Sequence, residues 1–428
     1  MNSPLILKNG RIIDPATNRD EIGDICINNG HIVSSTEISA TDASVHNLQG
    51  KWVVPGLIDM HVHLREPGQE YKETILTGTR AAAAGGFTAI VCMPNTKPVN
   101  DNASITRFII EQAKNCPARV YPAGAISVKS QGAGLAEFGE MKEAGAVAVT
   151  DDGQPVLDSQ LMRRAMEYAT SHGLPLMSHS EEASLSKNGS MHEGAISTRL
   201  GLRGIPAAAE SIMVYREAAL AELTGARIHI SHVSTEASLA VIAMAKSRGV
   251  QITAETAPHY FTLTDEAVLG YNTNAKMNPP LRSEKDRRAI LKALQDGTLD
   301  AIATDHAPHS TLEKELEFNL AANGITGLET SLPLSLALVR GNIISAKRLI
   351  ELMSVNPARI LGLAGGRIAP GDIADLTVID PERQFTFTAA SSYSKSKNSP
   401  FLGWNLKGKA VMTIMSGLVR YTEEQGVI

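Results

Sequence analysis

Residues 55–68 read PGLIDMHVHLREPG and join an apolar run to the histidines His61 and His63. The residues just before them, Trp52–Val54, lengthen that run, which is typical of a buried strand. Because alternate side chains of a strand point to the same side, both imidazoles should leave the strand end toward one point. A solvated histidine pair on a polar strand is the alternative, and the apolar run argues against it. The stretch therefore predicts the start of a metal site, since histidine is a preferred nitrogen ligand of zinc.

The chain on either side of this stretch alternates between strand-like and helix-like segments. Apolar residues recur at helical spacing in Asp158–His172 and Glu210–Ala221. Strand-like runs occupy Ala89–Met93, Arg119–Ala123, Ala146–Thr150, Leu174–Ser178, Arg227–His232, Gln251–Glu255 and Asp300–Thr304. Chemically capable residues end several of these runs, which favours a (β/α)8 TIM-type barrel over a doubly wound sheet.

Both ends of the chain look like short strands and turns. Asn9-Gly10 lies between two apolar runs in Leu5–Ile13 and predicts a hairpin turn, and Asp24–Val33 repeats the pattern. Near the other end, Ala374–Asp380 and Gly408–Met415 alternate as strands do. We therefore expect an α/β protein in which residues 1–53 and 364–428 form one small β domain beside a barrel of residues 54–363.

The composition is that of an ordinary soluble protein. Hydrophobic residues make up 43% of the 428 positions. The net charge of −5 is not the positive charge that is typical of nucleic-acid-binding proteins. The three cysteines show no CxxC spacing, the N-terminus lacks a signal-peptide pattern, and no apolar run reaches membrane-helix length. These features predict a cytoplasmic protein that binds neither nucleic acid nor a membrane.

Four more strand-like runs end in residues that bind metals. Taken singly, a terminal histidine is more often structural than a ligand, but several in barrel order after apolar strands predict one shared site. The residues concerned are Asp151 and Asp152 after Ala146–Thr150, His179 after Leu174–Ser178, His232 after Arg227–Ser231, and Asp305 after Leu299–Thr304.

Strand alternation allows only one of Asp151 and Asp152 into the site, which leaves four histidines and two carboxylates. These are more ligands than one tetrahedral zinc requires, so the set predicts two cations that share a carboxylate. Such a pair can acidify a bridging water toward neutrality. No lysine lies between Lys142 and Lys187, so the run at 146–150 must offer an aspartate rather than a carboxylated lysine. Lys129, near another strand end, is interpreted as a surface residue.

The chain resembles the class I dihydroorotases of the amidohydrolase superfamily over essentially its whole length. The motifs that carry the resemblance are HVHLREPG at 61–68, MPNT at 93–96, TDDG at 150–153, KMNPP at 276–280 and ATDHAPH at 303–309. The paired histidines and the terminal aspartate belong to the whole superfamily. Arg65 together with Asn95 is narrower and points to dihydroorotase.

This resemblance implies a role for each residue of the motifs. Asp151 should point to the opposite side of its strand from Asp152, and His306 and His259 are expected to be packed or structural. The implied ligands are His61, His63 and Asp305 for the first zinc, His179 and His232 for the second, and Asp152 as the bridge. The implied substrate contacts are Arg65, Asn95, Asn278 and His309, with Asn323 and Gly324 in the loop that follows.

The implied activity is the reversible cyclisation of N-carbamoyl-L-aspartate to L-dihydroorotate in de novo pyrimidine (UMP) biosynthesis. Zinc-activated hydroxide would attack the ring amide carbonyl, and Asp305 would carry the proton to the ring nitrogen as general acid and base. A guanidinium at Arg65 suits the α-carboxylate, although a surface ion pair with Glu66 is the alternative. Asn95 and Asn278 could instead serve only as turn residues.

Segment 310–324 should close over the substrate, although this chain lacks the aromatic residue that often precedes Gly324 in the family. Two other readings stay open. An allantoinase or hydantoinase would use the same barrel on another cyclic amide, and a non-catalytic dihydroorotase-like subunit would support aspartate carbamoyltransferase. We expect a homodimer, and an active enzyme could also associate with that transferase.

Overall fold

Residues that follow Pro55 form strand β6 (Leu57–Val62), in which every residue is buried. The computed structural model describes residues 4–38 and 43–428. Between residues 57 and 302, all of which it describes, eight parallel strands pair in chain order. They are β6, β7 (Phe87–Cys92), β8 (Arg119–Gly124), β9 (Ala148–Val149), β10 (Leu176–Ser178), β13 (Ile228–Ile230), β14 (Ile252–Thr256) and β15 (Ala301–Ile302).

The barrel closes where its last strand meets its first. Val62 and His306 form a parallel bridge. The His63 N–H donates to the His306 carbonyl at 2.8 Å, and the Thr304 N–H donates to Asp59 Oδ1 at 3.1 Å. The two segments that carry His63 and Asp305 are therefore direct neighbours.

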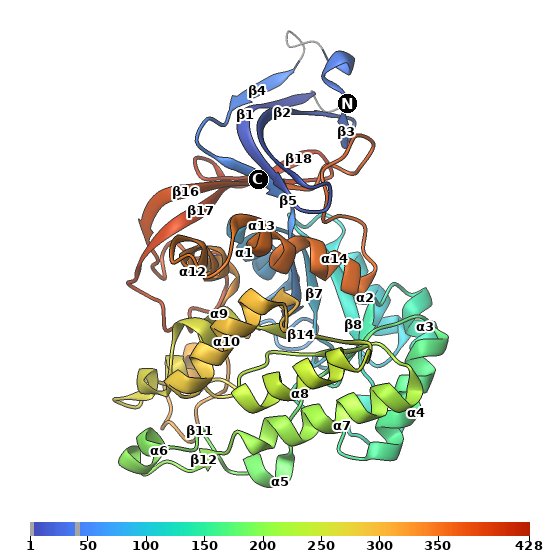
Figure 1. The fold of residues 1–428 in the computed structure, drawn as a ribbon, viewed down its shortest axis with the longest axis vertical. Coiled ribbons are helices and arrows are strands. Elements are labelled where there is room, and N and C mark those ends of the chain that lie inside the picture. The colour runs from blue at the N-terminus through green and yellow to red at the C-terminus, as the bar shows by residue number, and fades with distance from the viewer. Residues whose placement is uncertain (1–3, 39–42) are drawn as a thin grey trace.

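Each barrel strand is followed by a helix that covers its outer face (Figure 1). Helix α4 shows the pattern, since its buried residues are Met162, Ala165, Met166 and Ala169, at the spacing of one helical stripe. The helices are α1 (Ile75–Gly85), α2 (Ala103–Ala113), α3 (Phe138–Glu143), α4 (Ser159–Ser171), α7 (Ala208–Thr224), α8 (Glu236–Ser247), α10 (Glu284–Asp296) and α12 (Leu328–Arg340). The predicted TIM-type barrel is confirmed.

The two ends of the chain share a second sheet at one end of the molecule (Figure 1). Strand β5 (Trp52–Pro55) joins them, because it pairs in parallel with β1 (Leu5–Asp14) and antiparallel with β16 (Leu376–Thr386). The remaining strands are β2 (Arg19–Asn28), β3 (His31–Val33), β4 (Ser44–Asn47), β17 (Asn405–Met415), β18 (Leu418–Thr422) and β19 (Gly426–Val427). The small β element built from both termini is thus confirmed.

The predicted hairpin at Asn9-Gly10 is wrong. Strand β1 runs straight through these residues, and they form a bulge where the register against β2 shifts between Leu7 and Gly10. Asn9 takes φ 60°, and a Cβ on Gly10 would lie 2.6 Å from Val53 Cγ2. Glycine is needed here for close approach of β5, not for a turn. The similar Asn29-Gly30 does form the turn between β2 and β3.

Shorter elements lie in the loops of the barrel. Helices α5 (Ala183–Ser186) and α6 (Ala195–Leu200) and strands β11 (Met191–His192) and β12 (Gly204–Ile205) follow β10. Helix α9 (Pro258–Thr262) follows β14, α11 (Thr311–Lys314) follows β15, and α13 (Ala346–Ile350) and α14 (Asn356–Leu361) follow α12. Among the described residues, none of the helices combines the length and the apolar character needed to span a bilayer.

Candidate metal centre and substrate pocket

The six residues expected to bind metal lie together, all of them buried, at one mouth of the barrel. Asp152 is at the centre, with Oδ1 3.2 Å from His61 Nε2 and 3.5 Å from His232 Nε2, and Oδ2 3.4 Å from His63 Nε2. His179 Nδ1 lies 3.6 Å from Asp152 Oδ1, and Asp305 Oδ1 lies 3.1 Å from His63 Nε2. His61, His63 and Asp152 form one group whose ligand atoms lie within 4.8 Å of one another, and Asp152, His179 and His232 form a second.

Acceptors behind these histidines fix which ring nitrogen faces Asp152. His63 Nδ1 lies 2.8 Å from Asn95 Oδ1, and His61 Nδ1 lies 2.9 Å from Glu255 Oε1. Both acceptors hold the proton on Nδ1 and leave the lone pair of Nε2 toward Asp152. An outer hydrogen bond of this kind is the usual support of a metal-binding histidine.

His179 is held in the opposite orientation. Its Nε2 lies 2.9 Å from Glu181 Oε2, so its Nδ1 is the nitrogen that faces Asp152. Burial opposes the charge of Glu181, but the contact with His179 lowers its pKa to about 2. Glu181 is therefore a carboxylate that accepts the histidine proton.

Orphaned atoms at the centre of this cluster show that the residues suit a cation. Within the described part of the chain, His61 Nε2 and Asp152 Oδ1 are buried and have no hydrogen-bond partner. Such atoms are costly unless another group satisfies them, and nitrogen and carboxylate lone pairs converging at short range are satisfied by a divalent metal. The donor set fits a pair of cations that share Asp152.

Two of these side chains leave their strands through unusual backbone geometry. His232 has φ 38° after β13, and Asp305 has φ 48° after β15. Residues other than glycine reach this left-handed region at a cost of roughly 1–3 kcal/mol, and such strain is concentrated at functional sites. The strain is consistent with a site that dictates where both side chains point.

Asp151 and Lys129 lie outside the cluster. Asp151 turns away, and its Oδ1 accepts the N–H groups of Ile126 at 2.8 Å and Ser127 at 3.1 Å. Strand alternation therefore separates the two aspartates as expected. Lys129 is exposed, as predicted.

A pocket of about 340 Å³ opens beside the cluster. The six residues expected to contact the substrate all line it, together with five of the six metal-binding candidates. His61 lies behind these and does not line the pocket. The expected substrate contacts are Arg65, Asn95, Asn278, His309, Asn323 and Gly324, and the lining also includes Gly153, Gln154 and Ala307.

Arg65 and His309 both line one wall of this pocket. Arg65 is buried, and its Nε donates to the Pro308 carbonyl at 3.1 Å. His309 Nε2 lies 2.8 Å from the Asn323 carbonyl, to which it donates, and Lys72 Nζ lies 3.4 Å from Nδ1. Burial, with the charges of Arg65 and Lys72, lowers the pKa of His309 to about 3. His309 is therefore neutral, and its one N–H is bonded to the Asn323 carbonyl beside a fixed guanidinium.

Asn95 and Asn278 reach the pocket while bonded to the supports of the metal cluster. Asn95 accepts from His63, and Asn278 Nδ2 donates to Glu181 Oε2 at 2.6 Å. Sequence reasoning missed Glu181 and Glu255. Two features of the sequence could have pointed to them. Glu181 comes two residues after His179, the spacing of side chains on one face of a strand, and Glu255 lies in β14, a strand without an assigned ligand.

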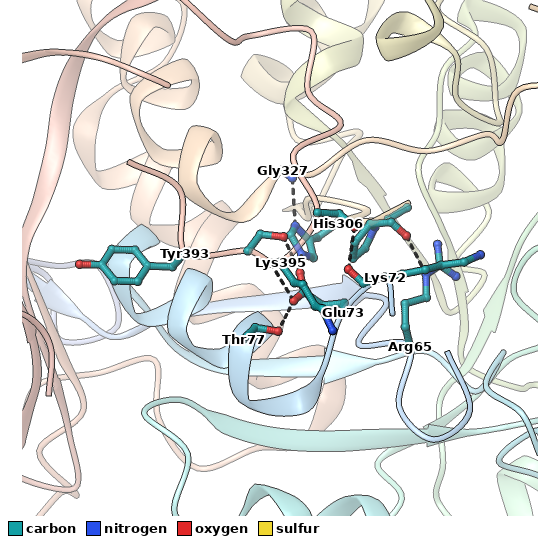
Figure 2. A network of polar contacts seen from close by, with 12 residues as sticks. Arg65, Lys72, Glu73, Thr77, His306, Gly327, Tyr393 and Lys395 are labelled. Carbon is teal, nitrogen blue, oxygen red and sulfur yellow. Dashed lines mark hydrogen bonds and ion pairs between the residues drawn. The ribbon is translucent and has the colours of Figure 1, made fainter. Parts of the chain in front are cut away.

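His306 does not line the pocket, and its ring lies beside Glu73 (Figure 2). Its Nδ1 accepts the Gly327 N–H at 3.1 Å, and its Nε2 lies 3.4 Å from Glu73 Oε2. Glu73 also accepts hydrogen bonds from Thr77 Oγ1 and from the Lys395 N–H. His306 therefore packs behind Asp305, and His259 is buried against Tyr260.

The segment after β15 covers one side of the pocket. Within this segment Phe318 and Ala321 are buried, whereas Leu312 and Leu320 are exposed. Lys314 is buried, and its Nζ donates to the carbonyls of Ala322 at 2.8 Å and Gly324 at 3.0 Å. The Lys314 side chain thus anchors the segment from within.

Comparison with known proteins shows that the sequence is similar to those of dihydroorotases. Residues 50–238 match the family model described as "Dihydro-orotase-like". A dihydroorotase of Desulfotalea psychrophila is 63% identical over 97% of this chain and 99% of its own length. A dihydroorotase of Geobacter metallireducens is 55% identical over 97% of this chain and 99% of its own length.

Solved structures with the same fold include hydantoinases. An L-hydantoinase of Arthrobacter aurescens superposes with a TM-score of 0.89 over 100% of this chain and 98% of its own, at 24% identity. A dihydropyrimidinase of Brevibacillus agri gives a TM-score of 0.86 over 99% and 96% of the two chains, at 23% identity. These likenesses concern the fold, whereas the sequence relatives decide the family. The chain belongs to the dihydroorotase family.

Proposed function

We propose that this protein is a dihydroorotase, which interconverts N-carbamoyl-L-aspartate and L-dihydroorotate in pyrimidine biosynthesis. The observation that carries the proposal is the pairing of a cation-binding cluster with a buried guanidinium in one pocket. The cluster suits attack on an amide, and Arg65 suits the carboxylate of the substrate. The dihydroorotase relatives over nearly the whole chain support the same activity.

We assign zinc to the cluster. His61, His63 and Asp305 would hold one ion, His179 and His232 a second, and Asp152 would lie between them. Bound zinc would supply an acidified water and would polarise the amide carbonyl. Asn95, Glu255 and Glu181 keep the required lone pairs free by accepting the outer histidine protons.

Asp305 is assigned the proton transfer. Its carboxylate lines the pocket, and its Oδ1 lies 3.1 Å from His63 Nε2. In ring opening it takes a proton as the water oxygen bonds to the carbonyl carbon, and gives it to the ring nitrogen as the amide bond breaks. In ring closure the nitrogen bonds to the carbonyl carbon and returns the proton to Asp305, which passes it to the departing hydroxyl oxygen so that water leaves.

The substrate carboxylate is assigned to Arg65. Its Nε is engaged by the Pro308 carbonyl and its Nη2 lies 3.3 Å from His309 Nε2, so Nη1 and the second N–H of Nη2 are left to meet an anion. His309 lies beside it as a neutral imidazole, and Asn95, Asn278, Asn323 and Gly324 complete the contacts. We also propose that segment 310–324 closes over the bound substrate and excludes water.

The experiment is a ring-opening assay with metal analysis on one purified sample. Zinc-loaded protein should open L-dihydroorotate, with much weaker turnover of hydantoin and allantoin. Preferred turnover of hydantoin or allantoin would support the other cyclic amidohydrolases instead. Absence of turnover with zinc bound would favour the non-catalytic subunit, although the presence of all six metal-binding candidates argues against that reading.

Finer assignments belong to the same proposal. We propose a cytoplasmic homodimer, and division of the chain into a barrel of residues 54–363 and a small β domain of residues 1–53 and 364–428. Light scattering would measure the oligomeric state. Co-elution with purified aspartate carbamoyltransferase would test an association with that enzyme.

A further inference from the structure

Part of the small β domain leaves its own sheet and reaches the pocket side of the barrel. The connection between β16 and β17 contains the segment Ser392–Ser399, and Figure 2 shows Lys395 of this segment beside Glu73. The Lys395 N–H donates to Glu73 Oε1 at 3.0 Å, and Ser396 Oγ donates to the Lys72 carbonyl at 2.6 Å. The segment is therefore bonded to the residues that precede helix α1.

Asn398 ends this contact and is buried. Its Oδ1 accepts the backbone N–H of His309 at 3.0 Å, and its Nδ2 donates to the backbone carbonyls of Ala307 at 3.1 Å and Gly324 at 3.0 Å. Its own carbonyl accepts the Thr326 N–H at 2.9 Å. The side-chain amide of one residue thus uses both its donors and its acceptor on two separate stretches of backbone.

Those two stretches form one wall of the pocket. Ala307, His309 and Gly324 all line it. They lie in close contact, because the Ala307 N–H donates to the Ile325 carbonyl at 2.7 Å and a Cβ on Gly324 would lie 2.6 Å from Ala307 Cβ. Asn398 hydrogen-bonds to both stretches of backbone where they meet. The position of the His309 ring depends on that contact.

We infer that Asn398 is a positioning residue for substrate binding, which holds His309 and Gly324 where the substrate meets them. The inference rests on the proposed function, whereas the hydrogen bonds of Asn398 are observed independently of it. Asn398 touches neither the metal cluster nor Asp305 by any hydrogen bond among the described residues. Its loss should therefore weaken substrate binding more than it slows the chemical step.

Asn398→Asp is the sharpest test, because aspartate keeps the shape and the acceptor but removes both N–H donors. A carboxylate oxygen would then face the carbonyls of Ala307 and Gly324 in a buried place, which is repulsive. The KM for L-dihydroorotate should rise at least about tenfold, while kcat falls less than about threefold and bound zinc stays unchanged. Asn398→Ala, which removes the contacts without adding charge, should shift KM in the same direction if the aspartate variant does not fold.

Asn356→Asp is the matched control. Asn356 is also buried, and its Nδ2 donates to the Asp300 carbonyl at 2.8 Å, at the start of β15 and so at the opposite end of the barrel. This variant should keep the KM of the unmodified enzyme. Equal KM values for the Asn398 variants and the unmodified enzyme would overturn the inference, as would a fall in kcat at constant KM or an equal KM rise in the control.

Hydrogen–deuterium exchange separates this inference from the proposed function. In the Asn398 variants, the amides of His309 and Thr326 should exchange faster, and those of barrel strands β7 and β8 should not. Unchanged exchange at His309 and Thr326 would overturn the inference even in an active enzyme. An unmodified, zinc-loaded protein without dihydroorotase activity would overturn the proposed function and leave this exchange result standing.

Discussion

His61 is oriented by a residue 194 positions away in the chain. Glu255 accepts its Nδ1 proton, and the other oxygen of Glu255 lies 3.3 Å from His229 Nε2. Burial alone would raise the pKa of Glu255, but the contacts with His229 and His61 lower it to about 2. The carboxylate is therefore ionised at neutral pH and selects the His61 tautomer that offers Nε2 to a metal.

Glu255→Gln should weaken zinc binding about 10- to 100-fold, the usual effect of removing an outer partner of a metal ligand. A glutamine amide can turn its N–H₂ toward His61, which would move the ring proton to Nε2. Competition with a chromogenic chelator measures the affinity, and circular dichroism checks the fold. An unchanged affinity in a folded variant would contradict this role.

Asp305→Asn should keep the fold and lose at least about a hundredfold in kcat, because an amide cannot carry the proton between water and ring nitrogen. Steady-state kinetics of ring opening measure the loss, and the melting temperature checks the fold. Zinc content must be measured in parallel, since Asp305 is also a ligand candidate. Near-normal kcat with zinc bound would remove Asp305 from the proton transfer.

Arg65→Lys should raise the KM for L-dihydroorotate about 10- to 100-fold. An ammonium keeps the charge but cannot form two parallel hydrogen bonds to a carboxylate, and hydrogen bonds to charged groups contribute about 1.5–3 kcal/mol. Succinimide, which lacks the carboxylate, should show no such dependence if it is turned over at all. An unchanged KM would show that the carboxylate binds elsewhere.

At the scale of elements, segment 310–324 is held by buried lysines. Lys314 donates to backbone carbonyls within the segment, and Lys276 Nζ donates to the Ala321 carbonyl at 2.7 Å. Burial lowers the pKa of Lys314 to about 7, with a further contribution from Lys276, and burial lowers that of Lys276 to about 8. Both groups bind a proton less tightly than a lysine in water.

The segment should accordingly close more firmly as pH rises from about 7 toward about 10, the pKa of a free lysine. A group whose pKa is lower in the closed state favours opening when protonated, so closure is most costly below pH 7. Protease cleavage within residues 315–323, corrected for protease activity at each pH, measures opening. Lys314→Met should flatten the pH dependence, and a steeper one in that variant would contradict the assignment.

Elements also show where sequence reasoning succeeds and where it stops. His179, His232 and Asp305 could be predicted because the carboxyl ends of barrel strands converge, so a strand boundary alone locates a side chain. Asn398 and Glu255 could not be predicted, since their partners are distant in sequence and their effect depends on contact in space. Asn9-Gly10 has the composition of a turn, but packing of β5 against Gly10 makes it a bulge.

Across the whole molecule, the metal cluster links both halves of the barrel. Its ligand candidates lie in or directly after β6, β9, β10, β13 and β15, so a bound cation would add a further link between strands that backbone pairing and side-chain contacts already join. A ligand that binds only the folded state at a hundred times its Kd adds about 2.7 kcal/mol of stability.

Removal of metal with a chelator should therefore lower the melting temperature by several degrees, and added zinc should restore it. Differential scanning calorimetry of the same sample before and after chelation provides the measurement. Dialysis against buffer without chelator is the control. An unchanged melting temperature after complete metal removal would mean that the cluster is equally stable without a cation.

The position of β5 between β1 and β16 has a consequence for synthesis of the chain. Ribosomes deliver β1 and β5 early and β16 only after the entire barrel has been translated. Until then, one edge of β5 has no neighbour and remains open to unwanted strand addition by other nascent chains. Heat-shock chaperones that shield such edges should therefore matter most for this protein late in translation, and least once residues 376–386 have emerged.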